Sequence, residues 1–141
     1  MDFIYYDKNL IVAVKPAGVI STDEPGGMPS LLREALGEDT DIRTVHRLDQ
    51  VVSGLMVFAQ NPETASELSR QIRVGEFKKT YLAVVRGVPE QRRGRMEDIL
   101  LRSKEQRKTF VVNKPCRGSQ EAVLEYHLLG TNGEKSMVEI N

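Results

Sequence analysis

A polar stretch that leads directly into an apolar run constrains this chain more than any other feature. The run Leu55–Ala59 is short, apolar and preceded by turn residues, so it predicts a buried strand. The residues before it, 45–54, read Val-His-Arg-Leu-Asp-Gln-Val-Val-Ser-Gly and predict a polar loop. Because the strand would hold this loop against the core, the loop is a place where a chain can position chemistry.

Arg47 and Asp49 are the charged pair of this loop. A nearby guanidinium favours the ionised form of a carboxyl group. A positioned carboxylate can then act as a nucleophile, as a base or as a stabiliser of positive charge. The alternative from these residues alone is a surface ion pair, which contributes little to stability.

The N-terminal part predicts a hairpin followed by a short helix. The apolar runs at 3–6 and 10–14 flank a three-residue polar turn, which is typical of two antiparallel strands. Ser30 is expected to cap a helix over residues 31–36, because a serine hydroxyl can accept from the first free backbone N–H groups.

The clearest helix is expected over residues 62–73. Asn61 can cap it, Pro62 has its φ angle preset for the first helical position, and Glu63 complements the positive end of the helix dipole. Apolar, β-prone runs predict further strands at 77–87, 99–101, 109–112, 122–129 and 136–140. Together these elements predict an α+β fold with a mixed, mainly antiparallel sheet and flanking helices.

Tyr81 lies within the strand expected over residues 77–87. On its own it predicts a core or cross-strand aromatic whose hydroxyl finds a partner.

Composition bounds the class of protein. The 141 residues are 40% hydrophobic and 28% charged, which suits one soluble globular domain. No apolar run is long enough for a membrane span, and the N-terminus has no signal-peptide pattern. Cys116 is the only cysteine, so it forms no internal disulfide and builds no zinc site by itself. A reducing cytoplasm is therefore the expected location.

The net charge of zero conceals a strong asymmetry along the chain. Residues 1–70 carry 6 basic and 11 acidic side chains, whereas residues 71–141 carry 14 and 9. Between Arg92 and Arg117 there are 9 basic residues and 3 acidic ones. Such a segment can contact phosphates, and a solvated basic loop is the alternative.

Several motifs, taken in order, resemble the RluA family of pseudouridine synthases, which isomerise uridine in RNA. The motifs are Lys15-Pro16-Ala17-Gly18, His46-Arg47-Leu48-Asp49 with Ser53-Gly54-Leu55, the helix begun by Asn61, and Lys79-Thr80-Tyr81-Leu82-Ala83. The resemblance implies a pseudouridine synthase-like catalytic domain over residues 1–141. It also implies a ribosomal or transfer RNA as partner, with no membrane involved.

The resemblance also implies a role for each site residue. The target uridine is flipped out of its stack, and Asp49 acts at its ribose, either by attacking C1′ or by taking a proton from C2′. Arg47 occupies the vacated space or contacts the RNA backbone, and Tyr81 packs against the base. His46 and Leu48 support the loop. No metal or organic cofactor is needed, because the substrate supplies both halves of the reaction.

The chain departs from the family pattern in two places. Val52 stands where the family usually has threonine, which removes a hydroxyl but keeps the β-branched shape. Family members also continue past a strand like Val138–Ile140 into Gly-Arg-Thr-His-Gln-Ile-Arg, whose arginine pairs with the catalytic aspartate. The chain stops at Asn141, so the last part of the domain is expected to be absent and the chain alone to be inactive. A sheet edge exposed near Ser136–Ile140 would then invite self-association.

Two other classes of protein remain as alternatives. An RNA-binding module would keep the basic segment and carry out no chemistry. A carboxylate-dependent glycosidase would need a second positioned carboxylate, and the sequence offers no clear partner for Asp49.

Overall fold

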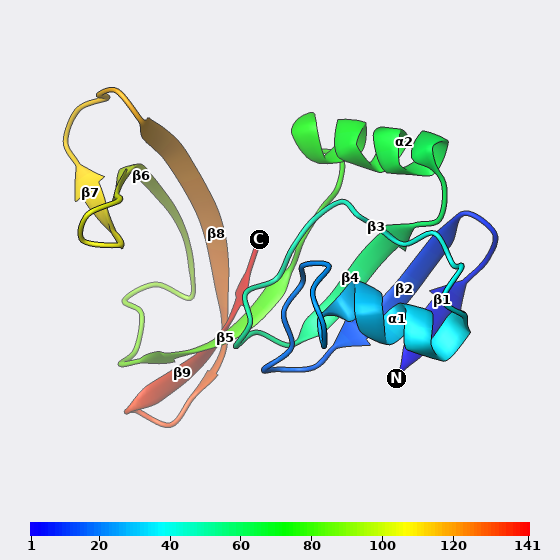
Figure 1. Cartoon of the computed structure of the whole chain (residues 1–141). Helices are drawn as coiled ribbons and strands as arrows, with labels where there is room; N and C mark the ends of the chain where they lie inside the picture. The colour runs from blue at the N-terminus through cyan, green and yellow to red at the C-terminus, as the bar shows by residue number, and fades with distance from the viewer. The chain divides into compact units, whose positions relative to one another are not determined.

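The computed structural model describes every residue from Met1 to Asn141 (Figure 1). The chain divides into two units, Met1–Phe77 and Lys78–Asn141. The first unit contains both helices and a four-stranded sheet, and the second consists of a five-stranded sheet. The assignment of residues 1–141 to one catalytic domain stays a prediction.

The sheet of the first unit has the strand order β1-β2-β4-β3, and every pair in it is antiparallel. The predicted hairpin is confirmed, because β1 and β2 pair directly. Its turn is closed by the Asp7 carboxylate, which accepts the backbone N–H groups of Asn9 and Leu10 at 2.8 and 2.7 Å. The four strands are β1 (Phe3–Tyr6), β2 (Leu10–Lys15), β3 (Arg43–Thr44) and β4 (Gly54–Ala59).

One face of this sheet forms the core of the first unit. Ile11 and Ala13 of β2 lie opposite Phe58 and Met56 of β4, so all four side chains share a face. They are buried together with the apolar residues of the first helix and with Leu48. Lys15 continues the same alternation along β2, and its side chain is therefore carried into the buried side.

The first helix, α1 (Met28–Leu36), begins three residues before the expected start. The expectation that Ser30 caps it is wrong: Ser30 lies within the first turn, and Gly27 occupies the N-cap without a side-chain hydrogen bond. Pro29 favours this start, because its fixed φ angle suits the first helical turn. Gly27 is required by a close approach, since a Cβ there would lie 2.1 Å from the Thr22 carbonyl oxygen.

The second helix, α2 (Pro62–Arg73), confirms the prediction at both ends. The Asn61 side chain accepts the backbone N–H of Thr64 at 2.8 Å, and Pro62 opens the first turn. Leu68 is the buried residue of its apolar face. Helix, cap and first-turn charge all depend on neighbours in the sequence, which explains why they were predictable.

The sheet of the second unit has the strand order β5-β9-β8-β6-β7, again with only antiparallel pairs. The strand expected over 77–87 begins only at Tyr81, and the other predicted strands are present and longer than expected. The α+β class is confirmed, with the expected mainly antiparallel sheet divided into two. The five strands are β5 (Tyr81–Arg86), β6 (Arg93–Ser103), β7 (Lys108–Val112), β8 (Ser119–Thr131) and β9 (Lys135–Ile140).

Strand β9 lies inside this sheet, so the expectation of an exposed edge at Ser136–Ile140 is wrong. Strand β5 pairs with it on one side and β8 on the other (Figure 1). The physical reason is that β5, far away in the sequence, runs alongside β9 and fills the position that was expected to be open. Neither helix is long and apolar enough to cross a membrane.

Candidate active site

The loop between β3 and β4 carries the polar motif, and Leu48 fastens its centre to the core. The Leu48 side chain is buried in the apolar cluster of the first unit. Its backbone is held as well, because the Ser21 hydroxyl donates to the Leu48 carbonyl at 2.6 Å and accepts the Leu48 N–H at 3.1 Å. Ser21 is 4% exposed. Asp49 therefore follows a residue whose side chain and main chain are both fixed.

His46 joins the start of the loop to strand β4. The backbone N–H of Val57 donates to His46 Nε2 at 3.0 Å. The imidazole also lies against the Phe77 ring, with a centroid distance of 5.3 Å and a tilt of 47°. These contacts set the entry of the loop, and the roles of His46 and Leu48 in catalysis stay predictions.

Lys15 fastens the end of β2 to the same loop. Its side chain is fully buried, and its ammonium group donates to the carbonyls of Pro16, Val19 and Gln50 at 3.0, 2.6 and 3.2 Å. Burial lowers the pKa of the Lys15 ammonium, while the negative charge of Asp49 raises it. The Lys-Pro-x-Gly motif pointed to this segment, but the sequence did not show that the lysine would be buried beneath the loop.

Gln50 completes the connection between the two motifs. Its carbonyl accepts the backbone N–H of Gly18 at 2.7 Å, and its side-chain amide donates to the Gly18 carbonyl at 3.0 Å. Gly18 has a φ angle of +92°, in the region that glycine adopts most readily. The residue that follows Asp49 is thus held on its backbone and on its side chain.

Arg47 and Asp49 themselves project from this fixed backbone into solvent. The distance from Arg47 Nη2 to Asp49 Oδ1 is 3.7 Å, and the two side chains are 75% and 78% exposed. An exposed pair at this distance is weak. The carboxylate is consequently available to a bound molecule, while hydrogen bonds hold the backbone of the residues on either side of it.

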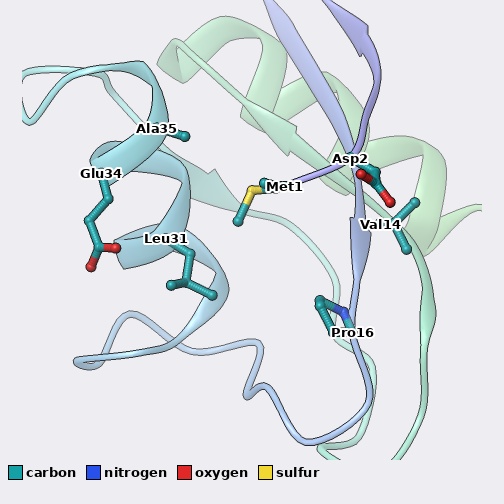
Figure 2. Close-up of a pocket in the computed structure, with 7 residues that line it drawn as sticks. All are labelled: Met1, Asp2, Val14, Pro16, Leu31, Glu34 and Ala35. Carbon is teal, nitrogen blue, oxygen red and sulfur yellow. The ribbon is translucent and has the colours of Figure 1, made fainter.

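Two hollows lie on the surface of the first unit. The one beside the motif is lined by loop residues that include Ser21, His46 and Arg47. The larger one lies between α1 on one side and the start of β1 with the end of β2 on the other, as Figure 2 shows. Pro16 is the one motif residue that lines it. We take the hollow next to Arg47 as part of the candidate site because the motif side chains border it.

Tyr81 belongs to the second unit, where it opens strand β5 and is 37% exposed. It pairs with Ile140, which in turn pairs with Tyr126, so the three side chains share one face of that sheet. The grouping of Tyr81 with Arg47 and Asp49 in one cleft stays a prediction.

The chemistry of the candidate site is that of an accessible carboxylate beside a guanidinium. The structure has no group of three or more His, Cys, Asp or Glu side chains that could hold a metal ion. Asp49 can attack an electrophilic carbon or take a proton, and Arg47 can contact a phosphate.

A family model described as RNA pseudouridylate synthase matches residues 9–141. Among curated relatives, the ribosomal large subunit pseudouridine synthase D of Borreliella burgdorferi is 34% identical, over 97% of this chain and 45% of its own length. The dual-specificity RNA pseudouridine synthase RluA of Haemophilus influenzae is 38% identical, over 62% of this chain and 41% of its own length.

Solved structures show the same fold. The human RNA pseudouridylate synthase domain containing 4 aligns with a TM-score of 0.81 at 24% identity, over 98% of this chain and 57% of that one. A second human protein, RNA Pseudouridylate Synthase Domain Containing 1, aligns with a TM-score of 0.82 at 21% identity, over 98% of this chain and 57% of that one. The chain thus spans about half the length of the curated relatives that it matches.

Proposed function

The chain belongs to the RNA pseudouridylate synthase family, and we propose that a protein containing it converts uridine in RNA to pseudouridine. The observation that carries the proposal is Asp49, an accessible carboxylate on a backbone held by Leu48, Ser21 and Lys15. A reaction at a ribose carbon needs such a group, because the carboxylate must reach the substrate while its own position is fixed.

In this proposal Asp49 acts at the ribose of a uridine that has left its stack, by attack on C1′ or removal of a proton from C2′. The N-glycosidic bond breaks, the uracil turns, and a bond forms from C1′ to the carbon at position 5, whose proton is released. Arg47 contacts the RNA backbone beside the vacated position, and Tyr81 packs against the base. His46 and Leu48 keep the loop in place.

The kind of RNA is a finer part of the proposal. Relatives of the chain carry names that specify the large ribosomal subunit or dual specificity, so we propose ribosomal or transfer RNA as the substrate. The location that we propose is the cytoplasm, where both RNAs are available.

We also propose self-association, through the part of β8 that does not pair with β9. Pairing of the last residues with β8 ends where Glu125 and Asn141 exchange backbone hydrogen bonds at 3.0 and 2.9 Å. The part of β8 over residues 119–124 pairs with β6 on its other side only. A strand of a second chain can pair there. Sedimentation at rising concentration tests this: dimers support the edge, and a monomer at high concentration refutes it.

Tritium release from RNA labelled at carbon 5 of uridine tests the activity. The new carbon–carbon bond displaces that hydrogen, so we expect release by a version of this chain extended to the length of its relatives, and none by residues 1–141 alone. RNA binding by the extended protein without any release would instead support a binding module. Release by both at equal rates would show that residues beyond Asn141 are dispensable.

A further inference from the structure

A strongly basic surface surrounds the tip of the hairpin formed by β6 and β7. Its cations are brought together by the register, in which Arg102 lies opposite Thr109 and Ser103 opposite Lys108. Lys104 and Arg107 lie in the turn between the strands. Adjacent residues of a strand point to opposite faces, so the charges lie on both faces of the hairpin and at its tip.

The connection from β7 to β8 adds two further cations. Strand β6 lies between β7 and β8, so residues 113–118 must cross it. The crossing is near Leu101, since a Cβ on Gly118 would lie 3.9 Å from Leu101 Cδ1. The Ser119 hydroxyl donates to the Cys116 carbonyl at 2.8 Å and accepts the Cys116 N–H at 2.9 Å, which closes the turn before β8. We define the basic hairpin by its exposed cations Arg102, Lys104, Arg107, Lys108, Lys114 and Arg117.

None of these six cations takes part in an ion pair within the chain. The six ion pairs of the structure involve other basic residues, such as Arg95, which lies 2.6 Å from Glu97 on the same strand. Glu105 is the one acidic residue between Arg102 and Arg117. The charge of the basic hairpin is therefore available to an external anion.

The backbone conformation at Arg107 is a second observation that favours a binding role for the hairpin. Its φ angle is +51°, and it is the one residue other than glycine with a positive φ. Glycine would adopt this conformation with less strain, so the Arg107 guanidinium stands at a position that disfavours a side chain. Backbone strain of this kind is concentrated at binding and functional positions.

Apolar side chains are interleaved with the cations. Phe110 is 42% exposed and Val111 62% exposed. As neighbours on β7 they point to opposite faces, so they do not form one apolar plane that could insert into a lipid surface. An exposed aromatic among cations suits a nucleic acid, whose bases stack on it while phosphates meet the charges.

We propose that the basic hairpin binds the phosphate backbone of RNA, in a contact that carries affinity without reading sequence. The inference rests on the proposed function for its choice of anion. Its charges on both faces and at the tip fit a polyanion that lies around the hairpin. Phosphate contacts of this kind position a nucleic acid but specify no base.

The test compares two triple variants of the 141-residue chain that lose the same charge. One carries Arg102→Gln, Arg107→Gln and Lys108→Gln. The control carries Arg73→Gln, Arg86→Gln and Lys135→Gln, which removes three exposed cations that form no ion pair and lie outside the hairpin. Affinity for a fluorescent RNA stem-loop is measured by anisotropy from low to high salt.

We expect the hairpin variant to bind about tenfold or more weakly at low salt, with a salt slope shallower by about two to three. The control should keep both quantities near those of the original chain. Equal losses in the two variants would overturn the proposal, and so would the absence of RNA binding by the original chain.

Vesicles that contain an anionic phospholipid provide a further arm. Binding to vesicles that the hairpin variant loses, with RNA affinity unchanged, would assign the surface to a membrane and contradict the proposal. Tritium release is judged separately in the extended protein. RNA binding through the hairpin without tritium release would refute the proposed activity and support this inference. Tritium release by a protein whose hairpin substitutions do not change RNA affinity would support the activity and refute this inference.

Discussion

The Ser21 hydroxyl is bonded to both backbone groups of Leu48, at 2.6 Å to the carbonyl and 3.1 Å to the N–H. Residue 48 immediately precedes the exposed carboxylate of Asp49. Leu48 lies in a loop and has no strand partner, so the buried Ser21 hydroxyl satisfies its backbone groups instead. These bonds also fix the backbone next to Asp49, whose position the proposed reaction depends on.

Replacement of Ser21 by alanine should lower the free energy of unfolding by about 1–3 kcal/mol, because two buried backbone groups lose their partner. Urea unfolding followed by circular dichroism measures the change. The control is Ser66→Ala on the exposed side of α2, which should change stability by less than about 0.5 kcal/mol. Equal effects of the two substitutions would show that the Ser21 bonds contribute nothing specific.

Lys15→Met should also destabilise the chain, by about 1–3 kcal/mol. Methionine retains the apolar length of the side chain but cannot donate to the three carbonyls that the ammonium group binds. Hydrogen exchange of the amides in residues 45–54 should rise more than exchange in α2. A Lys15→Met variant as stable as the original, with unchanged hydrogen exchange, would show that the Lys15 hydrogen bonds do not stabilise the loop.

Acid stability provides a third prediction. The Glu67 carboxylate accepts hydrogen bonds from Arg70 and Gln71, and these contacts lower its pKa from 4.5 to about 2. The unfolded chain then binds this proton more readily than the folded chain, so the contribution of Glu67 is complete above about pH 4.5 and is lost as the pH falls toward 2.

Unfolding at pH 5 and pH 3 checks this sign. Glu67→Gln should make the stability less dependent on pH over that interval, whereas Glu90→Gln, at an exposed position that forms no ion pair, should leave the dependence unchanged. A Glu67→Gln variant that loses stability as steeply as the original would contradict the assignment.

Local signals in the sequence predicted the local structure well. Asn61 and Pro62 predict the start of α2, and the polar turn at Asp7 between two apolar runs predicts the hairpin. The start of α1 was missed because Ser30 is a good cap by type, whereas the deciding contact is the close approach of Gly27 to the distant Thr22 carbonyl.

Local sequence patterns do not predict which strands pair when those strands are far apart in the chain. The position of β9 between β5 and β8 depends on pairing across some fifty residues of chain, and loop closure of that length leaves no mark in a local pattern. Asp49 and Arg47 stood out by type and motif. Ser21 and Lys15 did not, because a serine in a turn and a lysine before a proline reveal their burial only when the core is assembled.

We propose Asp49 as the essential group for uridine isomerisation, and the Asp49→Asn variant tests this role. The extended protein is compared with its Asp49→Asn variant and with an Asp39→Asn control from the exposed acidic loop. Tritium release from RNA and RNA affinity are both measured. We expect Asp49→Asn to abolish release and to keep the RNA affinity within about threefold, while the Asp39→Asn control stays active. Substantial release by the Asp49→Asn variant would show that the Asp49 carboxylate is not essential.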